Sequence, residues 1–352
     1  MDLIVMITGA GAPGIKGTLY SLHENFDGRK IKTVGVDIRE HVVGKYLCDK
    51  FYRIPPPSSQ DFIPTLLSIC EKEKVDVILP QVTAELFELS KHKKDFENIG
   101  TAVAISSYNA IVHSNNKYEL MKVSKKLGLP TPEFFLVNNF EDLEKYAIKL
   151  GYPENPVVVK PPVSNGMRGL RIINENINYK EQFYKEKPTG ITTRMDDLYR
   201  VIGDTFPELI VMEYLPGDEY SVDVLKTKDD IIIVPRLRVE IRSGITFSGI
   251  IVKHEEIIKH VEILTEELGL EYAFGYQFKN DKEGVPKIIE CNPRIQGTMV
   301  MSTLAGANLI YGAVKYALGE EIPKLEINWG TKFLRYWGGI GIFKEREEVQ
   351  II

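Results

Sequence analysis

Short apolar runs alternate with amphipathic stretches through the first third of the chain. Four of these runs are read as short strands, at 3–8, 33–36, 75–79 and 101–105. Apolar residues recur at helical spacing in two stretches between them, 62–73 and 84–94. This order predicts an open parallel sheet with helices on both faces over roughly residues 1–112.

A glycine pattern follows the first predicted strand. Gly9, Gly11 and Gly14 form Gly-x-Gly-x-x-Gly, and Asp37 ends the second strand, where a dinucleotide fold places its ribose-binding acid. A nicotinamide-dependent oxidoreductase is therefore one alternative. The same glycines also serve tight strand-to-helix packing without any cofactor, and this alternative leaves the rest of the chain unexplained.

A second region begins near residue 113. A helical pattern opens at Asn116 and stops at Gly128, and the strand 156–160 then ends in Lys160. The turn 163–169 and the strand 170–173 follow. A strand, a Ser/Gly turn and a returning strand can fold over phosphates as a lid, with Lys160 pointing toward them. The alternative is a plain hairpin turn with a solvated lysine.

A strand, a Pro-Gly turn and another strand lie between residues 209 and 224. Where the first strand ends, at Glu213, Tyr214 and Leu215, free backbone groups can pair with an adenine. Beyond the turn, Glu219 can accept ribose hydroxyls. The alternative is an acidic surface hairpin.

The most informative stretch is a predicted hairpin of strands 272–278 and 286–291. If Asp281 faces Pro286, then Gln277 faces Glu290, and alternation puts Glu290 and Asn292 on one face. These oxygen donors, Gln277, Glu290 and Asn292, suit Mg²⁺, with Mn²⁺ as an alternative. Arg294 would then lie beside the metal and a transferring phosphoryl group. A solvated glutamate and a surface arginine in a turn are the alternative.

A basic strand follows the predicted hinge. Alternation places four charged side chains of 235–242 on one face: Arg236, Arg238, Glu240 and Arg242. Guanidinium groups bind carboxylate and phosphate in bidentate fashion, so this face suits an anionic substrate. A solvated strand face balanced by Glu240 is the alternative.

Composition sets the remaining limits. With 352 residues, 43% hydrophobic and 26% charged, the chain predicts a globular protein of two or three domains. No apolar run approaches the length of a spanning helix, and the three cysteines lack the spacing of a metal site or a disulfide framework. The net charge of -5 gives no sign of nucleic-acid binding. We therefore expect a cytoplasmic protein with neither a membrane nor a nucleic acid as partner.

In their order, these blocks resemble an ATP-grasp domain, and residues 1–320 are similar to one half of the large chain of carbamoyl phosphate synthetases and to biotin carboxylase. The resemblance implies roles residue by residue. Lys117 matches a basic residue that contacts the nucleotide, and Lys160 matches the lysine before the lid. The segment from Glu213 to Leu215 matches the hinge that binds adenine, and Glu219 matches the acid that binds the ribose. The metal ligands of the family are matched by Gln277, Glu290 and Asn292. Arg294 matches the arginine that follows them. Ser164, Gly166 and Gly169 are the expected nucleotide-binding residues of the lid. The lid has fewer glycines than many relatives, which leaves open the question of which amides contact phosphate.

The resemblance also implies an architecture: an α/β, N-terminal parallel-sheet pre-ATP-grasp domain followed by a two-lobed α+β ATP-grasp domain. We expect these at 1–112 and 113–320, with a small lid lobe at about 118–210 and a C-terminal extension at 321–352. A complete carbamoyl phosphate synthetase is not expected, because neither a second module nor a glutaminase segment is present.

The implied activity is an ADP-forming ligation that activates a carboxylate as an acyl phosphate and joins it to an amine, with ATP and Mg²⁺. The expected catalytic residues are Arg294, Lys160 and Arg236. The residues expected to bind the anionic substrate are Arg236, Arg238, Arg242 and Arg294. Small molecules are the expected partners, and the resemblance favours a homodimer. A non-catalytic module that binds Mg-ATP remains the second alternative. The sequence does not choose among amino acids, small peptides and bicarbonate as substrates.

Overall fold

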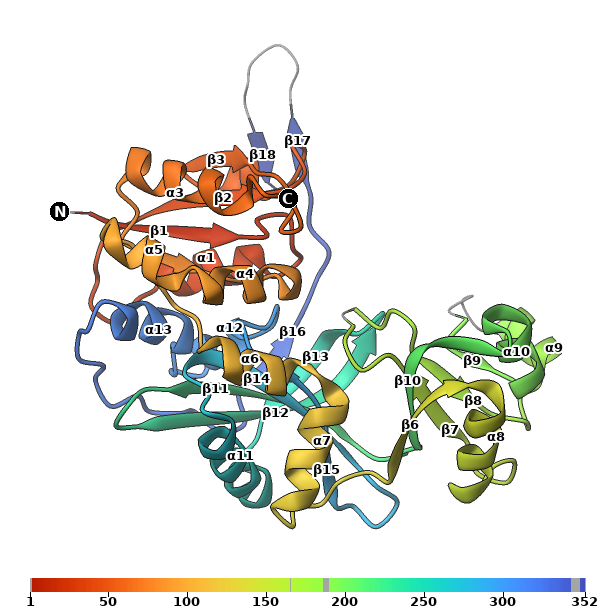
Figure 1. The fold of residues 1–352 in the computed structure, drawn as a ribbon. Helices are drawn as coiled ribbons and strands as arrows, with labels where there is room; N and C mark the ends of the chain where they lie inside the picture. The colour runs from red at the N-terminus through yellow and green to blue at the C-terminus, as the bar shows by residue number, and fades with distance from the viewer. Residues whose placement is uncertain (1, 165, 186–189, 343–348, 352) are drawn as a thin grey trace. The chain divides into compact units, whose positions relative to one another are not determined.

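The computed structural model describes residues 2–164, 166–185, 190–342 and 349–351 (Figure 1). Its contacts divide the chain into two compact units. Unit 1 combines residues 1–114, 220–277 and 291–352, and unit 2 combines 115–219 and 278–290. The predicted C-terminal extension, 321–352, lies partly outside the described residues, and the domain boundaries expected at 112 and 320 stay predictions.

The N-terminal part of unit 1 is the parallel sheet that the sequence predicts. Its strands follow the order β3-β2-β1-β4-β5. Their bounds are β1 Leu3–Thr8, β2 Ile31–Asp37, β3 Lys50–Arg53, β4 Val77–Leu79 and β5 Ala102–Val103. Side chains of β1 alternate between two cores: Val5 joins α1 and α13, and Met6 joins α3. Burial on both faces explains why apolar residues predominate in β1 and β4.

Helices cover both faces of this sheet. They are α1 Ile15–His23, α2 Gly44–Leu47, α3 Phe62–Glu73, η1 Thr83–Glu85, α4 Leu86–Lys91, α5 Lys93–Asn98 and α6 Tyr108–Asn115. The expected helix at 62–73 is confirmed. The single helix expected at 84–94 is wrong, because a 3-10 turn opens the stretch and the backbone leaves helical geometry at His92 (φ -99°, ψ 14°).

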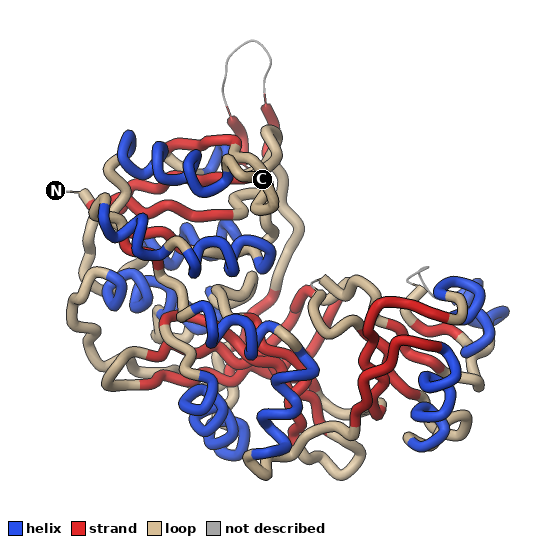
Figure 2. Tube along the Cα trace, viewed as in Figure 1, coloured by secondary structure: helices blue, strands red, loops and turns tan. Residues whose placement is uncertain are grey.

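A second sheet has the order β15-β14-β11-β12-β13-β16. Its strands are β11 Glu219–Lys226, β12 Ile231–Arg242, β13 Ile245–Ile251, β14 Tyr272–Asn280, β15 Pro286–Asn292 and β16 Lys332–Leu334. Further helices of unit 1 are α11 Glu255–Leu268, α12 Val300–Leu304 and α13 Leu309–Ala317, and a hairpin pairs β17 Ile340–Ile342 with β18 Val349–Ile351. Figure 2 shows the strands of this sheet in red.

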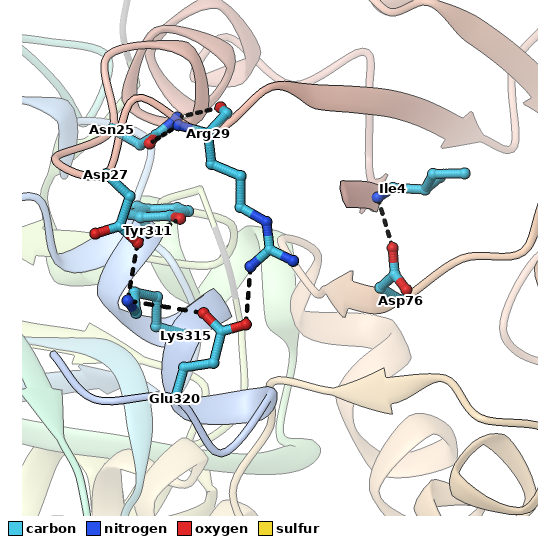
Figure 3. Close-up of polar contacts among 8 residues, drawn as sticks. All are labelled: Ile4, Asn25, Asp27, Arg29, Asp76, Tyr311, Lys315 and Glu320. Carbon is cyan, nitrogen blue, oxygen red and sulfur yellow. Dashed lines mark hydrogen bonds and ion pairs between the residues drawn. The ribbon is translucent and has the colours of Figure 1, made fainter. Parts of the chain in front are cut away.

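Polar contacts tie the loop after α1 to α13 within unit 1 (Figure 3). Lys315 bonds Asp27 at 2.8 Å, and Arg29 bonds Glu320 at 2.8 Å. The Tyr311 hydroxyl donates to the Asp27 carboxylate at 2.9 Å. These contacts hold the loop after α1 against α13 and the turn that follows it.

Unit 2 is built around an antiparallel sheet with one parallel pair at its edge. The strand order is β6-β10-β7-β8-β9, with β6 Phe134–Asn139, β7 Val157–Lys160, β8 Arg171–Ile173, β9 Thr192–Thr193 and β10 Thr205–Glu213. Its helices are α7 Lys117–Lys126, α8 Phe140–Lys149, α9 Tyr179–Lys185 and α10 Met195–Ile202.

The two faces of this sheet have different neighbours. Val157, Val159 and Val211 pack against α8 and α10. Ile210 and Met212 face the other way and pack with Met121 of α7. Lys160 pairs with Ile210 across the sheet, so the lysine lies on the α7 face. Among the described residues, no helix combines the length and the apolar character that crossing a bilayer requires.

Candidate functional site

Two lysines are buried in unit 2, and local structure places both. Lys117 is the first residue of α7, where the Asn116 side chain caps the helix by accepting from the amides of Tyr118 and Glu119. Lys160 ends β7. The exposed fractions are 4% for Lys117 and 6% for Lys160, so both ammonium groups are nearly withdrawn from water.

Both lysines donate to neutral oxygens. The Lys160 Nζ donates to the Ile289 carbonyl at 3.1 Å, and the Lys117 Nζ donates to the Ser164 carbonyl at 3.1 Å. Burial, the largest cause, lowers the pKa of Lys160; Glu290 and Glu219 oppose this shift, nearby Lys117 adds to it, and the resulting pKa is about 8. No carboxylate within the described part of the chain forms an ion pair with either lysine. An anion that accepted hydrogen bonds from both ammonium groups would therefore stabilise these two buried positive charges.

The turn between β7 and β8 has an unusual backbone. Gly166, Met167 and Gly169 all have positive φ, at 60°, 63° and 75°. A Cβ on Gly169 would lie 2.6 Å from Cγ of Pro161, so only glycine fits. The predicted hairpin is confirmed by the pairing of β7 with β8. Asn165, in the predicted lid, lies outside the described residues.

The predicted hinge leaves β10 at Glu213. Its carboxylate accepts from Lys287, which also bonds Asp281 at 3.3 Å. Burial would lower the pKa of Lys287, but the two carboxylates hold it above its usual value. Leu215 is buried, and Tyr214 is half-buried beneath the Lys279 ammonium at 5.8 Å from its ring centroid. The hinge is therefore fixed by the ion pair of Glu213 with Lys287 and by the burial of the Leu215 side chain.

A close backbone approach fixes the turn after the hinge. The Gly217 amide donates to the Asn280 carbonyl at 3.0 Å, and the Asn280 amide donates to the Asp218 carbonyl at 2.8 Å. A Cβ on Gly217 would meet Asn280 at 2.7 Å. Glu219 follows directly, 3.9 Å from the Lys279 ammonium. Glu219 is thus held at the rim of the same unit as Lys160.

The three predicted metal ligands lie on two strands. Glu290 and Asn292 are two residues apart on β15, so their side chains project from one face. Gln277 lies on β14. Glu290 is half-buried, and Asn292 Oδ1 accepts from Arg294 Nη2 at 3.1 Å. Convergence of all three on one metal stays a prediction.

Arg294 is held by the N-terminal part of unit 1. Its Nε donates to the Thr83 hydroxyl at 3.1 Å, and its Nη1 donates to the Ile295 carbonyl at 2.8 Å. The sequence-based reasoning missed the neighbouring Glu85, which is 3% exposed and accepts from the Val82 amide at 2.9 Å. Burial raises the pKa of Glu85 to about 7, against the hydrogen bonds it accepts and the charge of Arg294. A lone glutamate between apolar residues was the only signal for it.

The basic ladder is not the uniform face that alternation predicts. Arg236 is fully buried and donates to Asp223 at 2.7 Å, Gln296 at 2.9 Å and Thr298 at 2.8 Å. This burial corrects the expectation of a substrate-facing group at Arg236: the guanidinium instead fastens the segment that follows Arg294. Contact of Arg236 with the reacting groups is therefore not supported.

The rest of the ladder is divided as well. Arg238 donates to the Thr246 hydroxyl at 2.9 Å and to the Gly244 carbonyl at 2.6 Å, whereas Arg242 is exposed and bonds Glu240 at 2.7 Å. Register shifts on either side of Glu240 interrupt the alternation. Roles for Arg238 and Arg242 in substrate binding stay predictions.

In the N-terminal glycine turn, the groups that would bind a dinucleotide make contacts within the protein. The Gly11 amide donates to Asp37 Oδ2 at 2.8 Å, and the Arg39 amide donates to Asp37 Oδ1 at 2.9 Å. A Cβ on Gly14 would lie 2.6 Å from Cα of Gly297. Asp37 is thus committed to its own loop, and the glycines serve packing. This geometry disfavours the nicotinamide alternative.

Comparisons with known proteins agree with this geometry. Residues 205–333 match the family model described as ATP-grasp in the biosynthetic pathway with Ter operon, and residues 5–104 match the PylC-like N-terminal domain. Residues 205–333 therefore carry an ATP-grasp domain. The predicted resemblance and fold class are confirmed.

Among relatives of this ATP-grasp chain is the carbamoyl phosphate synthase large chain of Caldanaerobacter subterraneus, 25% identical over 283 residues, which are 75% of this chain and 24% of the relative. The chain thus spans about a quarter of such relatives. Among solved structures, the ADP complex of N5-carboxyaminoimidazole synthetase from Staphylococcus aureus has a TM-score of 0.68 at 19% identity, covering 93% of this chain and 81% of that one. An L-amino acid ligase from Bacillus licheniformis has a TM-score of 0.64 at 16% identity, covering 90% and 74%.

Proposed function

We propose that this ATP-grasp protein is an ADP-forming ligase that uses ATP and Mg²⁺ to join a small-molecule carboxylate to an amine. The observation that carries the proposal is the pair of buried lysines, Lys117 and Lys160, which donate to neutral oxygens. Because an unpaired buried charge is unfavourable, a polyphosphate that accepts from both lysines would be bound strongly.

The remaining predicted nucleotide residues belong to the same unit. The turn with Ser164, Gly166 and Gly169 would offer backbone amides to phosphate oxygens. The backbone of Glu213 to Leu215 would pair with the adenine, and Glu219 with the ribose hydroxyls. The ADP and MgADP complexes among the similar structures support this proposal, since those proteins share the fold.

In the proposed reaction a substrate carboxylate oxygen attacks the γ-phosphorus of ATP, and ADP leaves as the bond to the β-phosphate oxygen breaks. The amine then attacks the carbonyl carbon of the acyl phosphate. The amine loses a proton and inorganic phosphate leaves, so the products are an amide, ADP and phosphate. Lys160 would neutralise charge on the transferring group, and Arg294 would bind the acyl phosphate oxygens.

Glu290, Asn292 and Gln277 would hold Mg²⁺. Their donors are one carboxylate and two amide oxygens, which fits a hard cation that completes its shell with water and phosphate. Bound there, the ion would neutralise charge on the β- and γ-phosphates. The bond from Arg294 to Asn292 Oδ1 would orient that amide.

The test is a screen for ADP release over paired carboxylates and amines with the full chain. Glu290→Gln and Lys160→Met are each expected to lower turnover by about 10²- to 10³-fold, because each removes a preorganised charge. Arg200→Gln, at an exposed arginine of unit 2, is the matched control and should change nothing. ADP binding without substrate-dependent ADP release would favour the non-catalytic alternative. Near-normal turnover in both variants would remove the catalytic assignment.

We also propose the cytoplasm as the working compartment and a homodimer as the assembly. The three cysteines, Cys48, Cys70 and Cys291, are free thiols, which suits a reducing environment with ATP at hand. The homodimer rests on family resemblance alone.

A further inference from the structure

The last strand of the second sheet leads into a short run of exposed apolar residues in unit 1. Leu334 ends β16 with 78% of its surface exposed, and Tyr336 and Trp337 are each 71% exposed. Large apolar side chains that are exposed together in one patch mark sites where a ligand or partner binds.

Trp337 belongs to an aromatic stack. Its ring meets Phe247 edge-on, with centroids 4.9 Å apart, and the Arg242 guanidinium lies 4.4 Å from the Phe247 centroid. Phe247 itself is buried, so the ring of Trp337 is anchored at one edge while most of its surface stays open. A planar ligand could stack on that open surface.

Two cations border the stack without a carboxylate partner among the described residues. Arg335 donates to the Thr246 carbonyl at 3.3 Å and to the Pro13 carbonyl at 3.5 Å. The Lys16 ammonium lies 6.0 Å from the centroid of the Tyr336 ring. Burial lowers the pKa of Arg335, so an anion that accepted from it would be bound more firmly than at an exposed arginine.

A series of contacts within unit 1 connects this surface to the segment that begins at Arg294. Arg335 reaches Pro13, and the next residue, Gly14, lies against Gly297. Gly297 belongs to the segment that Arg236 fastens and that begins at Arg294. Arg335 is thus linked, through Pro13, Gly14 and Gly297, to the segment of unit 1 that begins at the arginine proposed to bind the acyl phosphate.

We infer that Arg335, Lys16, Tyr336 and Trp337 bind the amine substrate, and that this substrate is an amino acid with an aromatic or large apolar side chain. The carboxylate of the amino acid would pair with Arg335 and Lys16, and its side chain would stack on Trp337. Because its own carboxylate is held by cations, the free amine remains to attack the activated partner. This inference rests on the proposed ligase activity.

The chain contains two tryptophans, Trp329 and Trp337, which makes binding directly measurable. In a Trp329→Phe background, Trp337 is the only tryptophan, and L-phenylalanine should change its fluorescence saturably, with and without Mg-ADP. Glycine, which has the carboxylate but no side chain, should give a far weaker response. Arg335→Gln should weaken phenylalanine binding about tenfold or more, since a charge-assisted hydrogen bond is lost.

Arg335→Lys keeps the charge and should recover part of the affinity, whereas Arg200→Gln, at an exposed arginine of unit 2, should bind as the parent does. Circular dichroism of each variant checks that it is folded. Equal responses to glycine and phenylalanine, or none to either, would overturn the inference. So would a Trp337 signal that follows protein concentration and dimer formation in sedimentation, since a second copy would then be the occupant.

The two proposals can fail separately. Saturable phenylalanine binding without ADP release from any carboxylate and amine pair would remove the ligase activity and leave the binding site. ADP release that is indifferent to Arg335→Gln and Trp337→Ala would remove this inference and leave the ligase.

Discussion

Lys160 holds an ammonium group in the interior of unit 2, and its burial links the stability of the fold to nucleotide binding. The pKa of this amine falls from 10.5 to about 8, mainly through desolvation. Below pH 8 the folded and unfolded chains both carry the proton, so the folded state bears the full penalty. As the pH rises from 8 to 10.5 the folded state sheds the proton first, and the penalty disappears.

Lys160→Met is therefore expected to stabilise the ligand-free protein at pH 7 by roughly 3 kcal/mol, with the difference shrinking above pH 8. The same variant should lose most of its affinity for ADP, because the methionine offers no donor to phosphate. Urea unfolding between pH 7 and 10 and calorimetric titration with Mg-ADP measure the two effects. A variant that is less stable at pH 7 would show that the ammonium is already compensated in the free protein.

At the scale of elements, the turn between β7 and β8 makes a sharp contrast with other glycine turns. Gly169 and Gly128 both have positive φ, at 75° and 71°, but only Gly169 has a neighbour that a Cβ would strike. Gly128 ends α7 in open space. Comparing substitutions at Gly169 and Gly128 therefore separates two contributions to stability: the strain of a positive φ and the clash of an added Cβ.

Gly169→Ala should destabilise the hairpin by about 2–3 kcal/mol and weaken Mg-ADP binding, since both strain and a clash with Pro161 move the turn. Gly128→Ala should destabilise by only about 1 kcal/mol and leave the affinity for Mg-ADP unchanged. Unfolding in urea and titration with Mg-ADP report both quantities. Equal losses of affinity in the two variants would mean that the position of the turn does not matter for the nucleotide.

The spacing of apolar residues and the flanking turn residues were enough to predict those helices and strands that are specified by their own sequence. The strand 3–8 and the helix 62–73 were predicted with the bounds that the structure has, because apolar periodicity and flanking turns specify both. The break at His92 was missed, since the amphipathic spacing continues across it. Period alone does not reveal where a backbone leaves helical geometry.

Among the candidate site residues, the local pattern predicted positions along a strand but not the partners that come from other elements. Alternation predicted one common face for the charged residues of β12, but it could show neither the register shifts beside Glu240 nor that Asp223, Gln296 and Thr298 cover Arg236. Those partners come from other elements, far apart in the sequence. Glu85 was missed for a related reason, because its environment is created by packing.

At the scale of the molecule, unit 1 joins segments that are remote in sequence, and Gly14 with Gly297 is a contact between two of them. Gly14 has an ordinary backbone conformation, with φ -86° and ψ -8°, so its glycine is required for space alone. The relation is asymmetric: a Cβ on Gly297 would lie 3.8 Å from Cα of Gly14, which is normal contact.

Gly14→Ala is expected to destabilise the whole protein by about 2–4 kcal/mol, because two backbones must move apart. Gly297→Ala should stay within about 1 kcal/mol of the parent. Thermal unfolding of both variants gives the comparison. If Gly14→Ala were harmless, the loops would be free to separate and the two ends of unit 1 would not be rigidly joined.

The division of unit 1 into three stretches has a consequence for how the protein is made. Translation delivers residues 115–219 and 278–290 before any residue after 290, so unit 2 can assemble while unit 1 still lacks its third stretch. Asn292, Arg294 and Trp337 all lie in that late stretch. During synthesis the residues of unit 2 are therefore complete before Asn292, Arg294 and Trp337 have been added.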